Sequence, residues 1–200
     1  MNWKRWLGQY ERVSPMEFER WLFARFRRKY RNRTVVRLKT QDLLHISLWK
    51  LGHRQLENVA TNENVPPLTL PGPDLAGRMP GEIENTIRTL MRPLERLKGF
   101  GVCAASAVLT VLRPKVFSPI DKYAIRGVRE CLRGRGHPGY ERVAELAERS
   151  NLTSRDYATH MMSFWYLPNL YGGQIGDWSF RDVDRALWAF GKWGCETGAC

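Results

Sequence analysis

Residues 97–101 read Leu97-Lys98-Gly99-Phe100-Gly101 and lie between two apolar segments with helical spacing. Two glycines around one hydrophobic residue allow a very tight turn between two helices. The second segment then continues with small residues at 104–107, which let another helix or a nucleic-acid backbone approach closely. Such a turn can direct backbone N–H groups at a helix N-terminus toward a phosphate. The alternative is an ordinary turn between packed helices.

Helical patterns surround this turn on both sides. Ser14-Pro15-Met16-Glu17 has the form of a capping box with proline at the first helical position, and it predicts a helix over about 15–30. Thr153 and Ser179 each begin a helix-start pattern, and Pro168 is expected to end a helix. We expect the other helices at 40–59, 83–97, 102–112, 121–132, 139–149, 154–167 and 180–193. The sequence therefore predicts an all-α fold, a two-lobed helical bundle with short connections.

Prolines and glycines concentrate in one stretch of the chain, residues 62–82, which indicates a linker. We therefore expect three parts. They are a basic N-terminal helical lobe at 1–65, a Pro/Gly-rich linker at 66–82, and a region at 83–200 that contains the turn and the C-terminal helices.

The composition favours a globular protein with an anionic partner. The 200 residues include 32 Lys and Arg against 20 Asp and Glu, a net charge of +12, and 43% are hydrophobic, enough for a core. No apolar stretch approaches the roughly 20 residues that span a bilayer. We expect an intracellular, cytoplasmic protein associated with the nucleoid, acting as a monomer without membrane contact.

The positive charge is concentrated before residue 42. Between Glu19 and Asp42 there is no acidic residue, whereas nine Lys and Arg fall there, interleaved with aromatic residues. Cations on one helix face contact phosphates well, because neutralising phosphates releases condensed counterions. We therefore expect Arg27, Arg28 and Lys29 to bind phosphates. The alternative is a solvated helix face above an apolar underside.

The run from residue 97 to 128 resembles the helix–hairpin–helix (HhH-GPD) superfamily of DNA base-excision glycosylases. In that family a Leu-x-Gly-(Val/Phe)-Gly hairpin opens a small-residue helix, and a loop through a proline then delivers an aspartate just before another helix. Asp121 occupies that place. Bifunctional members carry a catalytic lysine two residues after the second glycine, where this chain has Cys103, 18 residues before Asp121.

Asp121 also suits the chemistry on physical grounds. Cleavage of an N-glycosidic bond builds positive charge on the sugar, and a nearby carboxylate stabilises that charge and orients the attacking water. The alternative is that Asp121 only caps the helix over 121–132, a position that aspartate favours. The two roles can coexist.

The resemblance implies a DNA glycosylase that flips and excises a damaged or mismatched base from duplex DNA. A cysteine cannot form the Schiff base of the bifunctional members, so we expect a monofunctional enzyme that leaves an abasic site. Two alternatives stay open: a non-catalytic helix–hairpin–helix DNA-binding protein, and a glycosylase/lyase with a displaced lysine, either Lys98, Lys115 or Lys122. The expected DNA contacts, besides those at 27–29, are Lys98, Gly99, Phe100, Gly101, Cys103, Ala104 and Lys122.

We expect no required cofactor. Only Cys195 and Cys200 lie near the C-terminal end, too few for the iron–sulfur cluster of one family branch. The family resemblance does suggest a structural potassium or sodium ion held by hairpin carbonyls at 99–102. A flipped base needs aromatic walls, and the candidates for them are Trp49, Trp165, Tyr166 and Trp178.

Overall fold

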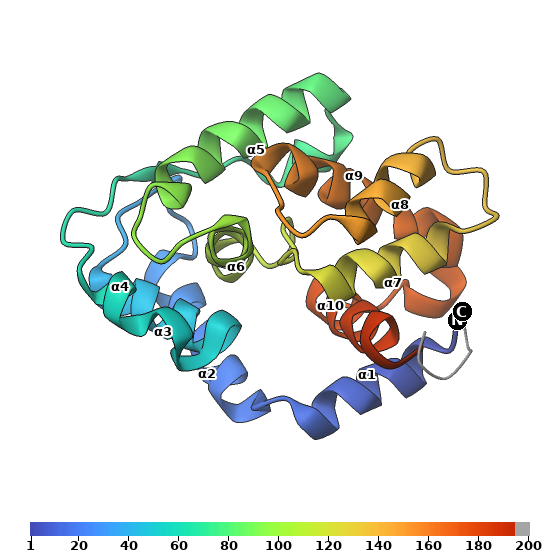
Figure 1. Cartoon of the computed structure of the whole chain (residues 1–200), viewed down its shortest axis with the longest axis horizontal. Helices are drawn as coiled ribbons and strands as arrows, with labels where there is room; N and C mark the ends of the chain where they lie inside the picture. Colours follow the sequence, from blue (N-terminus) through green and yellow to red (C-terminus); the bar gives the residue numbers. More distant parts are fainter. Residues whose placement is uncertain (195–200) are drawn as a thin grey trace. The chain divides into compact units, whose positions relative to one another are not determined.

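The computed structural model describes residues 1–194 and is mostly helical, which confirms the all-α prediction (Figure 1). Two short strands, β1 (Val35–Val36) and β2 (Leu68–Thr69), pair antiparallel with Val36 opposite Leu68. None of the helices within 1–194 combines the length and apolar character that a membrane crossing requires.

The contacts divide the chain into two compact units. Unit 1 comprises residues 1–14 and 120–200, and unit 2 comprises residues 15–119. This division differs from the expected one, because the proline- and glycine-rich stretch at 66–82 lies inside unit 2. Its prolines and glycines serve local structure there, including the turn η2 (Pro73–Gly77) and the start of a helix at Pro80.

Unit 2 is built around helix α6 (Val102–Leu112). All of its residues are buried except Cys103, which is half-buried. A helix that is apolar all round is stable only inside a core, and here α2, α3 and α5 pack against it. The other helical elements of the unit are α2 (Met16–Tyr30), α3 (Thr40–Leu51), η1 (Gly52–Gln55), α4 (Leu56–Ala60) and α5 (Pro80–Glu95).

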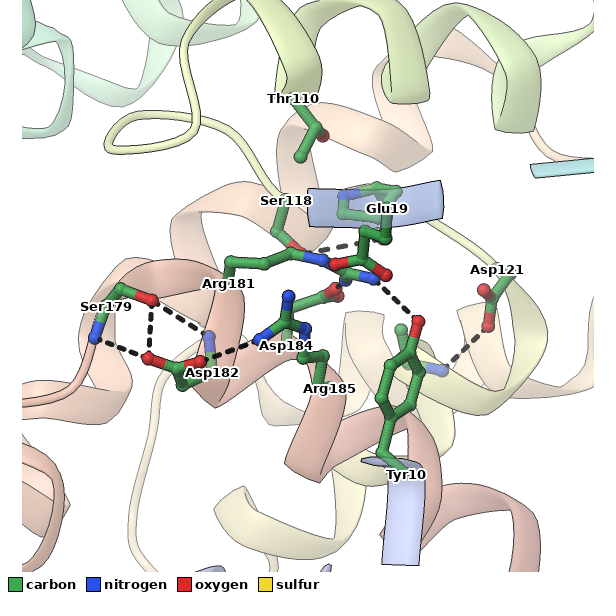
Figure 2. Close-up of polar contacts among 12 residues, drawn as sticks. Tyr10, Glu19, Thr110, Ser118, Asp121, Ser179, Arg181, Asp182, Asp184 and Arg185 are labelled. Atoms are coloured by element: carbon green, nitrogen blue, oxygen red, sulfur yellow. Dashed lines mark hydrogen bonds and ion pairs between the residues drawn. The ribbon is translucent and has the colours of Figure 1, made fainter. Parts of the chain in front are cut away.

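Unit 1 is organised around α7 (Lys122–Leu132), which contacts α8, α9, α10 and η3. Gly127 permits a close approach, because a Cβ atom there would collide with the backbone carbonyl of Leu187 on α10. Helix α1 (Trp3–Val13) packs on α10, where Arg181 pairs with Asp184 and donates a 2.8 Å hydrogen bond to the Tyr10 hydroxyl (Figure 2). The remaining elements are α8 (Tyr140–Glu148), α9 (Ser154–Ile175), α10 (Phe180–Ala189) and η3 (Phe190–Gly194).

The N-terminal helices differ from the prediction. No helix is predicted before residue 15, yet α1 is present, with Trp3, Trp6 and Tyr10 buried at helical spacing. The predicted capping box at 14–17 is wrong, because Ser14 ends α1 and α2 has no side-chain cap. The predicted helix over 40–59 is interrupted at Gly52, whose φ of +64° ends α3.

Two helix starts in unit 1 are confirmed, and one helix end is wrong. The hydroxyls of Thr153 and Ser179 accept hydrogen bonds from backbone N–H groups of α9 and α10 in capping boxes. Pro168 does not end its helix. The chain stays helical to Tyr171, where φ −126° and ψ 16° mark a kink, and the residues after the proline include the buried Tyr171 and Ile175, which pack into the core.

Candidate nucleic-acid interface and catalytic carboxylate

The predicted hairpin is a tight turn between α5 and α6. Gly99 has φ +78°, a left-handed conformation that other residues rarely adopt. The N–H of Phe100 donates to the carbonyl of Leu97 over 3.1 Å, and both side chains are buried. Gly101 then precedes the first residue of α6. The two glycines thus sit at the turn itself and at the start of the following helix.

The side chain of Asn62 clasps the hairpin from the segment after α4. Its Oδ1 accepts from the backbone N–H of Lys98 over 2.9 Å, and its Nδ2 donates to the carbonyl of Lys98 over 3.0 Å. The amide therefore pairs with Lys98 as a second peptide group would in a sheet. Asn62 is 9% exposed, so loss of this pair would leave polar groups without partners in a partly buried place.

Helix α4 closes against the hairpin at Gly99. A Cβ atom on that residue would lie 3.1 Å from the Cβ of Asn58 and 3.1 Å from Cγ2 of Val59. Glycine is thus required here both by its φ angle and by the close approach of α4. The clasp and this contact fix the turn from one side.

The other residues expected to bind DNA at the hairpin divide into exposed and buried ones. Lys98 and Gly101 are exposed and Cys103 is half-buried. Phe100 and Ala104 are 6% and 2% exposed, so only their backbone groups can meet DNA. A groove of about 400 Å³ lies beside the hairpin and is lined by Arg96 and Lys98 among others. Unit 2 thus presents cations where the turn is exposed.

The basic end of α2 also belongs to unit 2, which holds 18 Lys and Arg against nine Asp and Glu. Arg27 and Arg28 are exposed, as phosphate contact requires. Lys29 instead forms a 2.6 Å ion pair with the buried Asp42. Its charge is thus already neutralised within the unit, so of the three residues only the two arginines offer unpaired charge to a ligand.

Asp42 joins the end of α2 to the start of α3. One carboxylate oxygen, Oδ2, accepts from Lys29, from the Tyr30 hydroxyl over 2.8 Å and from the backbone N–H of Lys39 over 2.9 Å. Burial opposes ionisation of Asp42, but these hydrogen bonds outweigh it and hold the pKa of Asp42 below its usual value. Burial first, and the bond to Asp42 second, raise the pKa of Tyr30 well above its ordinary value.

Further hydrogen bonds continue this connection to the hairpin. Thr40, at the first position of α3, donates to the backbone carbonyl of Asn62 over 2.5 Å, and Asn62 holds Lys98. The basic end of α2, the start of α3 and the hairpin are therefore linked within one unit by side-chain bonds. No local sequence pattern predicts the bonds between elements, because their partners are 12 to 36 positions apart.

Several carbonyls of the hairpin accept hydrogen bonds, and one of them lies in the stretch 99–102 that is expected to hold a potassium or sodium ion. The carbonyl of Leu97 accepts from Phe100, that of Lys98 accepts from Asn62, and that of Gly101 accepts from Ala105 over 2.9 Å. Only Gly101 belongs to the stretch 99–102 where the ion is expected, so the ion stays a prediction.

Asp121, in unit 1, is the N-cap of α7. Its Oδ1 accepts from the backbone N–H groups of Tyr123 over 2.9 Å and Ala124 over 3.0 Å. The capping role considered for this residue is therefore real, and it holds the carboxylate in one orientation on the half-buried start of the helix. The structure is compatible with both roles, because a capped carboxylate is also a fixed one.

Cations and aromatic rings gather beside this carboxylate in unit 1. The exposed Lys122 places its Nζ 4.9 Å from the ring centre of Tyr123. Trp188 packs edge-on against Tyr123, and Lys192 lies 4.7 Å from the Trp188 ring centre. The sequence does not predict this group, because its residues come from α7, α10 and η3, which lie far apart in the sequence and come together only when the chain folds.

The four aromatic residues expected to form a base pocket are divided between the two units. Trp49 belongs to unit 2, where its indole N–H donates to Glu19 over 3.2 Å. In unit 1, Tyr166 packs against His137 with ring centres 4.5 Å apart, and Trp178 packs 6.3 Å from Trp3. Trp165 is half-buried on α9. The contacts of Trp49, Tyr166 and Trp178 are thus packing contacts and hydrogen bonds within their own units.

The described residues hold no cluster of three or more His, Cys, Asp or Glu that would suit a metal ion. Cys195 and Cys200, on which the expectation of no iron–sulfur cluster rests, lie outside the described residues.

No protein-family model, curated protein or solved structure matches the chain. The function is therefore argued from its residues and their geometry.

Proposed function

We propose that the protein is a monofunctional DNA glycosylase that binds duplex DNA containing a damaged or mismatched base and hydrolyses the N-glycosidic bond of that base. The observation that carries the proposal is the clasped glycine hairpin at 97–101, set in a strongly basic unit. A turn fixed in advance loses little conformational freedom when it binds a phosphate. The resemblance of residues 97–128 to helix–hairpin–helix glycosylases supports the same activity.

Binding would use backbone and side-chain groups of unit 2. Amide groups at the start of α6 would receive one DNA phosphate, while Lys98, Arg27 and Arg28 would neutralise others. Such contacts set affinity and register and carry no base sequence information. Other groups of the protein would therefore recognise the base, after the base has left the stack of the double helix.

Asp121 would carry the chemical step. As the bond from C1′ to the base nitrogen breaks, its electron pair leaves with the base, and the sugar becomes positively charged. The carboxylate stabilises that charge and accepts a proton from the water that adds to C1′. The departing base takes up one proton from solvent, and the products are the free base and an abasic site. Cys103 provides no amine for a Schiff base, so strand cleavage does not follow.

A panel of duplexes tests the proposal, each with one lesion or mismatch and each incubated with the protein with and without alkali. We expect strand breaks only after alkali for at least one duplex, and none with Asp121→Asn. The matched control is Asp182→Asn, which alters a helix-start carboxylate of α10. Breaks without alkali, trapped by borohydride, would indicate a lyase.

A non-catalytic DNA-binding protein is the second candidate, favoured by one observation: Asp121 has a complete structural role as a helix cap. If the protein binds duplex DNA but releases no base from a broad panel, this candidate is correct and the glycosylase proposal is wrong.

A further inference from the structure

Unit 1 contains a cavity of about 360 Å³ at the C-terminal end of α7. It is lined by the start of α1, by the last residues of α7 and the turn after them, and by single side chains from α9 and η3. Its size falls within the range of small-ligand sites. Asp121 caps the opposite end of α7, about 16 Å away for an eleven-residue helix. The cavity is therefore separate from the carboxylate of the proposed reaction.

The charge around this cavity is positive. Arg5, Arg133 and Arg135 line it, together with one acidic residue, Glu130. The Oε1 atom of Glu130 already accepts from Arg129 and from Arg133, both over 2.8 Å, so its charge is balanced. Within residues 1–194, neither Arg5 nor Arg135 forms an ion pair with a carboxylate. Among the described residues, these two guanidinium charges have no carboxylate partner.

Backbone groups at the cavity also favour an anion. Helix α1 begins here, and Asn2 caps it by accepting from the N–H of Arg5 over 3.1 Å, but its first turn carries no acid, so no negative side chain in that turn offsets the helix dipole. The carbonyls at the end of α7 would repel an anion, but two of them are engaged. Tyr171 donates to the carbonyl of Cys131 over 2.9 Å, and the N–H of Arg135 donates to that of Leu132 over 3.1 Å.

The walls of the cavity are aromatic. Trp6, Tyr171 and Phe190 line it, each less than a tenth exposed. The guanidinium of Arg5 lies 5.0 Å from the Trp6 ring centre, and that of Arg135 lies 5.7 Å from the Tyr171 ring centre. These contacts hold the two cations beside the rings. The cavity thus offers a planar apolar surface and two positive charges together.

We propose that this cavity binds a nucleoside 5′-phosphate, with Arg5 and Arg135 holding the phosphate and the aromatic walls contacting the base. The phosphate requires the cations, and a planar ring system gains from stacking on aromatic side chains. The nucleotide can be free or can be the phosphorylated 5′ end of a DNA strand. Both ligands present the same 5′-phosphate and the same base to the cavity.

Isothermal titration calorimetry of the full chain at 0.15 M salt tests this site with adenosine 5′-monophosphate, adenosine and inorganic phosphate. We expect saturable binding of the monophosphate, with adenosine and phosphate at least about tenfold weaker, since each lacks one half of the interaction. Absence of saturable binding overturns the proposal. Inorganic phosphate that binds as tightly as the nucleotide also overturns it.

Variants locate the site. Arg135→Gln and Arg5→Gln are each expected to weaken the monophosphate about tenfold, the usual cost of one charge-assisted hydrogen bond. Arg142→Gln, an exposed arginine on α8 away from the cavity, is the matched control and is expected to leave binding unchanged. Equal affinities for Arg135→Gln, Arg5→Gln and Arg142→Gln would refute the assignment. Thermal unfolding checks each variant, and Arg5, exposed on the rim, remains informative if Arg135→Gln does not fold.

Two oligonucleotides of one sequence, with and without a 5′-phosphate, identify the source of the nucleotide. A preference for the phosphorylated strand that Arg135→Gln abolishes supports a strand end, whereas equal affinity with binding of the free monophosphate supports a free nucleotide. Binding at this cavity is expected to persist in Asp121→Asn. Loss of base excision with retained nucleotide binding would therefore separate the two proposals.

Discussion

Replacing Asp121 by asparagine separates the two roles of that side chain. An asparagine oxygen can still accept from the backbone N–H groups of Tyr123 and Ala124, and asparagine is as good an N-cap as aspartate. The negative charge, however, is lost. We expect the free energy of unfolding to change by less than about 0.5 kcal/mol, while the excision rate falls about 10²- to 10⁴-fold, the usual contribution of a general base.

Asp121→Ala provides the comparison, because it removes both the cap and the charge. We expect a loss of about 1 kcal/mol in stability, which lowers the melting temperature by about 2–4 °C in a chain of this size. Excision should be as slow as in Asp121→Asn. The assays are single-turnover release of the base from the best duplex of the panel and thermal unfolding followed by circular dichroism. An asparagine variant that excises at the wild-type rate would refute the catalytic role.

The further predictions concern unit 2. Gly99→Ala should destabilise the fold by about 1–2 kcal/mol in denaturant unfolding, because φ is +78° there. Asn62→Ala should destabilise it by about 1–3 kcal/mol, because Lys98 loses two hydrogen bonds. Both variants should bind duplex DNA more weakly, and unchanged binding would contradict the role of the clasp. Arg28→Gln should reduce the slope of log affinity against log salt concentration by about one, whereas Lys29→Gln should lower stability by about 1–3 kcal/mol, since Lys29 holds the buried Asp42. Burial first, and Arg25 second, lower the pKa of His45, so the folded protein binds fewer protons there than the unfolded chain and loses stability as the pH falls below about 6.5. His45→Phe should make chemical unfolding less dependent on pH between 7 and 5, and an unchanged dependence would count against this origin.

Local signals in the sequence predicted much of the helical structure. The bounds of α6 match the predicted 102–112, and the helix starts at Thr153 and Ser179 were both predicted, because each depends on residues only a few positions apart. Failures arose where distant packing decides the outcome. Buried neighbours keep α9 helical past Pro168, which local rules take as a stop.

The sequence predicted the hairpin better than the groups that support it. Two glycines around Phe100 indicate the turn directly. The choice of Asn62 as its clasp depends on a contact between residues 36 positions apart, and no composition or periodicity reports such a contact. The same holds for Lys29, whose place in a basic run predicts phosphate binding but whose partner, Asp42, is supplied by another helix.

The short pairing of β1 with β2 has a consequence for the dynamics of the hairpin. By joining Val36 to Leu68, it closes a loop of about 30 residues that contains α3, α4 and Asn62. Closing a loop of this length costs about 3 kcal/mol of chain entropy. While the two strands stay paired, they tether the loop that carries Asn62, and the effective concentration of Asn62 near Lys98 is high. When the strands separate, this effective concentration falls and the two hydrogen bonds between Asn62 and Lys98 become weaker. The amide protons of Leu70, which donates to Thr34 beside the strands, and of Lys98 should therefore exchange with solvent in one cooperative opening, so that the four strand residues set how long the hairpin keeps its clasp.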